Sequence, residues 1–160
     1  MNTVMRYLVL GGGPAAFNAA KSIREMDGAA SITLITDEGL PPYNRPLLTK
    51  ALEQDLPEKR LLIKDAAWYQ EQRIDLRLNT AVTGINTGAK QVSLPDGATL
   101  PYDRLIYALG ARCSVPPIPG SDLPHVFTIR NLADVRALQA RLPGCSHAVV
   151  IGGGVLGLEA

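Results

Sequence analysis

The chain has 160 residues, about the length of one domain, and 46% of them are hydrophobic, which is enough to form a packed core. Its formal net charge of +1 at pH 7 gives no electrostatic reason to expect a nucleic acid or a membrane surface as a partner. Residues 1–6 carry no export signal, and no apolar run approaches the length of a membrane-spanning helix. These properties predict a globular fragment that stays in the cytoplasm.

A βαβ unit is predicted near the amino terminus. The apolar run 7–10 is typical of a buried parallel strand, and helical sequence follows from about residue 15 to residue 26. A turn at Asp27-Gly28 separates this helix from a second apolar strand at 32–35. The first strand and the helix are joined by the glycine-rich turn Gly11-Gly12-Gly13-Pro14-Ala15-Ala16.

This turn has the residue pattern of a pyrophosphate site. Gly11 permits the tight reversal, Gly13 lets the main chain approach a phosphate, and Ala16 allows close packing of helix and strand. Pro14 suits the first helical position, because its φ is already set and it has no N–H to leave unpaired. A pyrophosphate is expected at the free amides and positive dipole end of this helix. A lone glycine run can also be a simple flexible turn, so the interpretation depends on the surrounding βαβ unit.

A carboxylate for the ribose hydroxyls is expected about 20 residues after the glycines. Asp37 and Glu38 fall there. Counting along the strand puts Thr36 at the usual acidic position and Asp37 one step beyond it. Of these residues we favour Asp37.

The glycine pattern occurs a second time, in Gly152-Gly153-Gly154-Val155-Leu156-Gly157. The apolar run 148–151 before it is expected to be a strand, and 156–160 provide about one helical turn. A complete strand-helix-strand unit needs about thirty residues. The repeat therefore predicts two dinucleotide sites in a longer protein, of which this chain is an amino-terminal part.

Between the two glycine turns the sequence predicts short elements. Strands near 75–78 and 81–86, and a hairpin around Pro95-Asp96-Gly97, are expected to be antiparallel insertions. Residues 115–120 are too rich in proline for a helix or a central strand, and they predict a stiff connector. The remaining expected elements are a loop leading into a short helix near Pro46, a helix at 65–72, a strand at 104–109, a strand at 126–129, and a helix from the N-cap Asn131 to about Leu142.

The cysteines and histidines do not form a recognisable site. Cys113 and Cys145 lie outside any metal or dithiol spacing, so we expect them to be packing residues. His125 and His147 are expected at strand starts, and neither has a second ligand at helical spacing. No metal site is predicted.

Five motifs in this order resemble the pyridine nucleotide-disulfide oxidoreductase superfamily, and together they cover essentially the whole chain. Within it, the motif at 42–50 resembles the branch of NADH:rubredoxin reductases, oxygenase-type ferredoxin reductases and the flavin-bearing part of NADH-dependent nitrite reductase. The motifs are the turn at 11–16, then Pro42-Tyr43-Asn44-Arg45-Pro46-Leu47-Leu48-Thr49-Lys50, Ala108-Leu109-Gly110, Pro117-Ile118-Pro119-Gly120, and the second turn with Leu158-Glu159.

The resemblance implies an α/β fold. Residues 1–114 would form a Rossmann-like FAD-binding domain, with a parallel sheet, helices and inserted small antiparallel strands. Residues 115–146 would be a connector with a strand and a helix. Residues 147–160 would be the first strand and turn of a second Rossmann domain, which binds NAD(P) and is truncated here.

The resemblance also implies roles for single residues. Gly11, Gly13 and Ala16 would line the FAD pyrophosphate, and Arg45 would pair with its phosphates. Lys50 would be the catalytic cation beside the isoalloxazine ring, and Glu159 would lie in the nicotinamide pocket. The expected cofactor-binding residues are Gly11, Gly13, Pro14, Ala15, Ala16, Thr36, Asp37, Glu38, Arg45, Lys50, Ala81, Val82, Ala108, Leu109, Gly110, Gly152, Gly154, Gly157 and Glu159, with the backbone at 81–82 meeting the adenine.

Two departures from the family pattern affect the expected chemistry. Leu109 stands where relatives in this branch usually have threonine, so a hydroxyl hydrogen bond is lost. Residues 43–50 contain no cysteine, whereas the disulfide reductases and peroxidases of the superfamily have cysteine in this stretch. Electrons are therefore expected to leave the flavin edge directly for an outside acceptor.

The resulting hypothesis is an FAD-dependent NAD(P)H oxidoreductase that passes electrons to a carrier such as rubredoxin or ferredoxin, with the isolated fragment expected to be inactive. The alternatives are a non-catalytic nucleotide-binding fragment, an NADH oxidase, or the flavin part of an NADH-dependent nitrite reductase. The choice between NADH and NADPH, the electron acceptor and the oligomeric state stay open.

Overall fold

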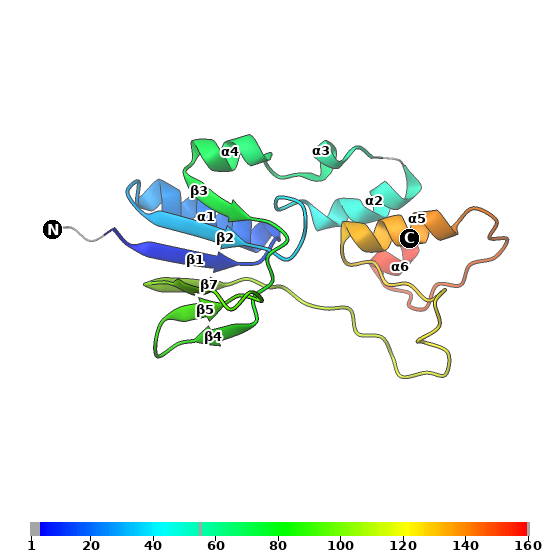
Figure 1. Ribbon diagram of the computed structural model, residues 1–160. Coiled ribbons are helices and arrows are strands. Elements are labelled where there is room, and N and C mark those ends of the chain that lie inside the picture. Colours follow the sequence, from blue (N-terminus) through cyan, green and yellow to red (C-terminus); the bar gives the residue numbers. More distant parts are fainter. Residues whose placement is uncertain (1–3, 55, 160) are drawn as a thin grey trace. The chain divides into compact units, whose positions relative to one another are not determined.

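The computed structural model describes residues 4–54 and 56–159 (Figure 1). The chain forms two compact units. One, here called the sheet unit, contains residues up to 43 and residues 62–110. The other, here called the helical unit, contains residues 44–61 and those from 111 onward.

The sheet unit is built on a four-stranded parallel sheet (Figure 1). Its strand order is β3-β2-β1-β7, and Val9 of β1 lies opposite Leu34 of β2 and Ile106 of β7. The strands are β1 Arg6–Leu10, β2 Ser31–Ile35, β3 Ile74–Arg77 and β7 Arg104–Tyr107. The predicted strands at 7–10, 32–35 and 104–109 are confirmed, although β7 ends two residues early.

Strand β3 corrects one expectation. The sequence predicted an antiparallel insertion near 75–78, whereas β3 pairs in parallel with β2 at the edge of the main sheet. Helix α4 (Ala66–Glu71) precedes β3, and a helical crossover returns the chain in the direction needed for parallel pairing. The helix itself was predicted, and its N-cap Asp65 accepts a hydrogen bond from the Trp68 amide.

One face of the parallel sheet is covered by helices. Helix α1 (Pro14–Met26) buries Ala16, Phe17, Ala20 and Ile23, which recur at the spacing of one helical face. The Phe17 ring lies 5.2 Å from that of Trp68 in α4, so the two helices share one core. The predicted helix at 15–26 and the first helical position of Pro14 are both confirmed.

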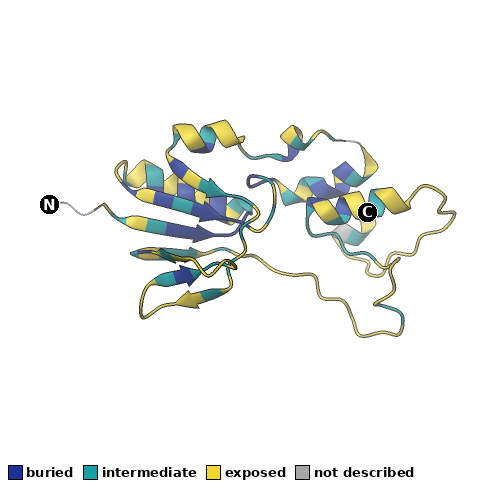
Figure 2. Ribbon diagram, viewed as in Figure 1, coloured by how far each residue is buried: buried dark blue, intermediate teal, exposed yellow. Residues whose placement is uncertain are grey.

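The opposite face of the sheet carries a second core (Figure 2). Leu8 and Leu10 alternate with Val9 along β1, and they pack with Val92 and Tyr102. This alternation explains why β1 and β2 read as nearly continuous apolar runs, since both faces of a covered parallel sheet are buried.

Val92 belongs to a separate three-stranded antiparallel sheet, in the order β4-β5-β6. Its strands are β4 Gly84–Asn86, β5 Gln91–Ser93 and β6 Thr99–Pro101. The predicted hairpin around Pro95-Asp96-Gly97 is therefore confirmed. Residues 81–83, expected to begin the preceding strand, lie outside it, because the pairing with β5 starts only at Gly84.

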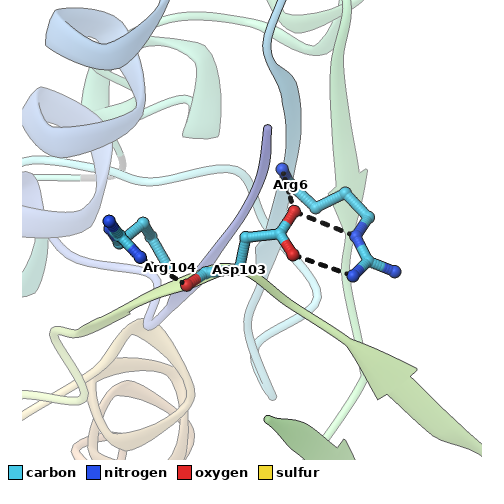
Figure 3. A network of polar contacts seen from close by, with 3 residues as sticks. All are labelled: Arg6, Asp103 and Arg104. Carbon is cyan, nitrogen blue, oxygen red and sulfur yellow. Dashed lines mark hydrogen bonds and ion pairs between the residues drawn. The ribbon is translucent and has the colours of Figure 1, made fainter. Parts of the chain in front are cut away.

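Strands β1 and β7 of the parallel sheet are joined near their amino-terminal ends by an ion pair between Arg6 and Asp103 (Figure 3). The Asp103 carboxylate accepts hydrogen bonds from the Arg6 amide at 2.8 Å and from its guanidinium at 3.1 and 2.9 Å. The Asp103 amide donates back to the Arg6 carbonyl at 2.9 Å. The hydrogen bonds from the Arg6 side chain and backbone lower the pKa of Asp103 to about 2.

The helical unit consists of η1 Arg45–Leu47, α2 Leu48–Glu53, α3 Glu58–Leu61, α5 Leu132–Arg141 and α6 Val155–Glu159. Helices α5 and α6 both pack against α2 (Figure 1). Gln139 of α5 donates to the Ala51 carbonyl of α2 at 2.7 Å, and Arg136 forms an ion pair with Glu58 of α3. The predicted helix after Pro46 is thus present as η1 and α2.

Helix α5 confirms a cap predicted from the sequence. The Asn131 side chain accepts from the Asp134 amide at 2.9 Å, and the Asp134 carboxylate accepts from the Asn131 amide at 3.1 Å. This reciprocal capping box defines the helix start. The proline-rich connector at 115–120 has neither helix nor strand, as expected.

Two predicted strands of the helical unit are wrong. Residues 126–129 and 148–151 form no strand, and Val149, Val150 and Ile151 are 86%, 56% and 74% exposed. A strand is held by hydrogen bonds to a neighbouring strand, and the described residues offer no partner to either segment.

The cysteines and histidines of the helical unit also differ from expectation. Cys113 and Cys145 are exposed free thiols rather than packing residues. His125 and His147 do not begin strands, because the strands expected after them do not form.

Candidate functional site

The first glycine turn is fixed between three strands. Gly11 directly follows β1, and its amide donates to the Ile35 carbonyl of β2 at 2.8 Å. Its φ is +129°, and a Cβ there would overlap the carbonyl oxygen of Ala108, the residue after β7. Glycine is therefore required at this position for two reasons, the backbone conformation and the close approach of a neighbouring strand end.

Gly12 was absent from the predicted site, and the structure shows that it too has a steric role. A Cβ on Gly12 would overlap the hydroxyl of Thr36, which directly follows β2 and is buried. Thr36, a predicted ribose residue, therefore packs against the turn. The signal in the sequence was a glycine between Gly11 and Gly13, at a position where the dinucleotide pattern has no requirement.

The amino terminus of α1 is open to an anion. Gly13 is the N-cap and has no side chain, and Pro14 has no N–H. The amides of Ala15 and Ala16 belong to the first turn, where helical amides have no partner within the helix. No acidic residue occupies that turn. The predicted residues 13–16 thus form an uncapped helix terminus that favours negative charge.

The segment after β2 holds a carboxylate firmly. The Glu38 amide donates to the Thr36 hydroxyl at 3.2 Å, and the Glu38 carboxylate accepts from the Tyr43 hydroxyl at 2.5 Å. Tyr43 is buried, Glu38 is half-buried and Asp37 is exposed. Tyr43 was not predicted as a site residue, although it stands in the motif at 42–50 that carried the family resemblance.

Other predicted residues lie at the same edge of the sheet unit. Ala108 follows β7, and its amide donates to the Leu10 carbonyl at 2.9 Å. Leu109 and Gly110 after it are exposed, and Gly110 has a φ of +72°. The carboxyl ends of parallel strands meet at one edge, which is where ligands bind in open α/β sheets. This edge carries Gly11, Thr36 and Ala108.

Ala81 and Val82 come a few residues after β3, one of the strands that end at this edge. The amide of Thr80 donates to the Thr36 carbonyl at 2.9 Å, which ties the residue before Ala81 to the end of β2. Ala81 is exposed, and Val82 packs against the core formed by Leu8 and Leu10.

The remaining predicted residues belong to the helical unit. Arg45 donates to the Arg130 carbonyl at 2.8 Å, and Lys50 is exposed on α2. Glu159 in α6 accepts from the buried Thr49 hydroxyl at 3.2 Å. Thr49 was not predicted, and its place beside Lys50 in the same motif was the available signal.

The second glycine turn reproduces part of the first. Gly152 has a φ of +122°, and the Leu158 amide donates to the Gly154 carbonyl at 3.1 Å as the first bond of α6. A Cβ on Gly157 would overlap the Gly152 carbonyl oxygen. The third glycine therefore allows the helix to lie close to the turn, as the dinucleotide pattern requires.

The described part of the chain has neither a membrane-spanning helix nor a metal-binding cluster. No helix among residues 4–54 and 56–159 is long and apolar enough to cross a membrane. In the same part of the chain, no three histidine, cysteine or carboxylate side chains gather where they could hold a metal ion.

Comparison with known proteins connects this geometry to a family. The model of the pyridine nucleotide-disulphide oxidoreductase family matches residues 5–160. The ferredoxin–NAD(+) reductase component of the anthranilate 1,2-dioxygenase system of Burkholderia cepacia is 43% identical over 156 residues, which are 96% of this chain and 38% of that protein. Rhodocoxin reductase of Rhodococcus erythropolis is 38% identical, over 97% of this chain and 36% of the relative.

Solved structures give the same result. The ferredoxin reductase for the CYP199A2 system from Rhodopseudomonas palustris has a TM-score of 0.90 at 33% identity, over 96% of this chain and 38% of that one. NADH:rubredoxin oxidoreductase from Clostridium acetobutylicum has a TM-score of 0.87 at 31% identity, over 98% and 40%. The chain thus spans less than half the length of these relatives. It belongs to the pyridine nucleotide-disulphide oxidoreductase family.

Proposed function

We propose that this chain is the FAD-binding portion of an FAD-dependent NAD(P)H oxidoreductase that delivers electrons to a small carrier protein such as a rubredoxin or ferredoxin. The observation that carries the proposal is the uncapped amino terminus of α1, directly after β1 and Gly11, in a chain of this family. The ferredoxin and rubredoxin reductases among its relatives support the choice of acceptor.

The residues of the first glycine turn fit a dinucleotide diphosphate. Gly13 leaves the helix end uncovered, and the absence of an acidic residue from the first turn removes a source of repulsion. The amides of Ala15 and Ala16 would donate to the phosphate oxygens, strengthened by the helix dipole. Pro14 sets the helix direction without taking up a donor.

When bound, FAD would supply the chemistry that splits an electron pair from a nicotinamide into single electrons. The chain's own residues bind and orient the cofactor. Arg45 offers a planar guanidinium suited to phosphate oxygens, and Lys50 offers an exposed ammonium on α2 that would favour negative charge on the reduced ring. Glu159 and the glycines at 152, 154 and 157 would serve the nicotinamide nucleotide.

We also propose the domain division that the sequence predicts. Residues 1–114 would form the FAD domain, 115–146 a connector and 147–160 the start of an NAD(P) domain. The ferredoxin and rubredoxin reductases among the relatives support the cytoplasmic location that we propose.

The experiment is spectroscopic. The full-length protein, of which this chain is proposed to be the FAD-binding portion, should carry a flavin absorbance that bleaches on anaerobic addition of NADH, and it should reduce cytochrome c only when a rubredoxin or ferredoxin is added. A Gly13→Asp variant should lose the flavin, because its carboxylate would cap α1 and repel the phosphates. Gly28→Asp is the control, since Gly28 is exposed, has no positive φ, and a Cβ there would meet open space. A full-length protein that is colourless, or whose flavin NADH does not bleach, would refute the proposal.

A further inference from the structure

Helix α6 is joined to α2 by a side-chain hydrogen bond between residues 110 positions apart in the sequence. The Thr49 hydroxyl of α2 donates to the Glu159 carboxylate of α6 at 3.2 Å, and the two helices are in contact. Thr49 is only 8% exposed, so the donor lies in a place that is largely closed to water. The charge of the acceptor strengthens such a bond.

The Thr49 hydroxyl has a second acceptor within reach. The Pro46 carbonyl, one helical turn earlier in the chain, lies 3.4 Å from the same hydroxyl oxygen. A hydroxyl has one proton to donate, so it bonds well to only one of these two acceptors at a time. The Glu159 carboxylate is charged and closer, and it is preferred while α6 is in place. When α6 moves away, the hydroxyl can return to the backbone carbonyl, as threonine hydroxyls in helices commonly do. This contact therefore has two discrete arrangements.

Helix α6 is linked closely to the second glycine turn. A Cβ on Gly157 would overlap the Gly152 carbonyl oxygen, and the Leu158 amide donates to the Gly154 carbonyl at 3.1 Å. Turn and helix are therefore expected to move together. Val155 and Leu158 are 72% and 80% exposed, so these two side chains do little to hold α6 on α2. The placement of α6 depends correspondingly more on its hydrogen bond to α2.

Helix α2 is short enough to respond to the loss of one contact. It has six residues, and a helix of this length is not stable without tertiary contacts. Leu48, Thr49 and Ala51 are its buried residues. The Ala51 carbonyl accepts from Gln139 of α5 at 2.7 Å, and the bond from Thr49 to α6 is a second tie on the same short helix.

We propose that the hydrogen bond between Thr49 and Glu159 is a relay that makes α2 respond to a dinucleotide at the second glycine turn. A ligand that orders the turn also orders α6, which keeps Glu159 within reach of Thr49 and stabilises α2. When α6 moves away, the Thr49 hydroxyl bonds to the Pro46 carbonyl instead, and α2 loses this tie. Because α2 carries Lys50, occupancy of the second turn would be felt in the segment proposed to serve FAD.

The inference rests on the function proposed above, since it takes the second glycine turn as a nucleotide site. It concerns communication within the helical unit and assigns no contact with the ligand. Coupling of this kind is a free energy between two places in the protein, and it is carried here by an element with two arrangements.

The test is amide hydrogen exchange of the full-length protein, with NAD⁺ as the probe. In the wild type, NAD⁺ should slow exchange in residues 152–159 and also in α2, there by about fivefold, the size of one ordinary hydrogen bond. Thr49→Val removes the hydroxyl and keeps the branched shape, so the slowing should persist in 152–159 and disappear from α2. Thr49→Ser retains a hydroxyl and should retain the response of α2. This readout does not depend on turnover.

Thr33→Val is the matched control, because the Thr33 hydroxyl contacts the Asp75 carboxylate at 3.4 Å in the sheet unit. It should leave the response of α2 to NAD⁺ unchanged. Thermal melting of every variant separates a lost fold from a lost contact. Thr49→Ala is a second variant without the hydroxyl, for use if Thr49→Val does not fold.

The outcomes separate the relay from the proposed function. If α2 still responds to NAD⁺ when Thr49 has lost its hydroxyl, or if Thr33→Val also abolishes the response, the inference is wrong. It is equally wrong if NAD⁺ slows exchange in 152–159 of the wild type but not in α2. If NAD⁺ slows exchange in neither segment of the wild type, the proposed nucleotide site itself fails.

Discussion

The two glycine turns share one design but differ in what surrounds them. The first follows a strand with neighbours on both sides, and its glycines contact the residues just after β2 and β7. The second follows an exposed segment without strand pairing, and a Cβ on Gly152, Gly153 or Gly154 would meet open space. The glycines of the first turn are thus required by packing against neighbouring strand ends, whereas in the second turn only Gly157 is required by packing, against the carbonyl oxygen of Gly152 in the same turn.

This difference predicts that the same glycine-to-alanine substitution lowers the free energy of unfolding by different amounts in the two turns. The largest loss is expected at Gly11. Gly11→Ala needs a positive φ and displaces the Ala108 carbonyl, so it should lower the free energy of unfolding by about 3 kcal/mol or more. Urea denaturation followed by circular dichroism measures this. Gly28→Ala is the control, because a Cβ there has open space and no positive φ to oppose it. Equal stabilities of the two variants would contradict the account.

The next prediction concerns Gly12. Gly12→Ala should cost about 2 kcal/mol, because the added methyl overlaps the Thr36 hydroxyl. Thr36→Ala removes that hydroxyl, so the double variant should be more stable than the sum of the two single effects predicts. A double-mutant cycle from denaturant melts gives the coupling. Strict additivity would show that the two residues do not oppose each other.

Gly152→Ala in the second turn should cost only about 1 kcal/mol. The φ of +122° strains any other residue, but no atom lies near the new methyl group. The same melts apply, with Gly154→Ala as a control that has neither positive φ nor a close neighbour. A loss as large as that of Gly11→Ala would remove the contrast between the turns.

The smallest effect is expected for the ion pair between Arg6 and Asp103 in the sheet unit, and this effect depends on pH. The pKa of Asp103 is lowered to about 2, so its pairing with Arg6 stabilises the fold above the ordinary carboxyl pKa of about 4. That stability is lost as the pH falls from about 4 through 2. Asp103→Asn should remove this part of the acid transition, whereas Asp96→Asn, in the exposed hairpin turn, should leave it unchanged. Unfolding midpoints measured between pH 2 and 7 test this.

Strands β1 and β2 could be predicted because both faces of the parallel sheet are covered, so both runs are nearly continuously apolar. The caps at Asp65 and Asn131 could also be predicted, since each is a local pattern within four residues. The run at 148–151 has the same apolar character as β1, yet it forms no strand, because pairing depends on neighbours that no local pattern describes.

The residues of the candidate site divide in the same way, into those that a local pattern predicts and those that depend on tertiary neighbours. The sequence identified the glycines and the candidate carboxylates by spacing alone. It did not identify the supports of Glu38, because Tyr43 acts through a side-chain contact that spacing does not encode. The packing role of Gly12 depends likewise on Thr36, which only the folded sheet brings beside it.

The bond between Arg6 and Asp103 has a kinetic consequence. Arg6 and Asp103 are separated by 97 positions in the sequence. Both edges of β1 are paired only after β7 has been added to the sheet. Contacts between distant parts of a chain slow folding, because the entropy of closing the intervening loop is lost before the contact can stabilise the structure. During synthesis, β1 would therefore leave the ribosome long before its last partner, and this interval is when the nascent chain most needs protection from aggregation.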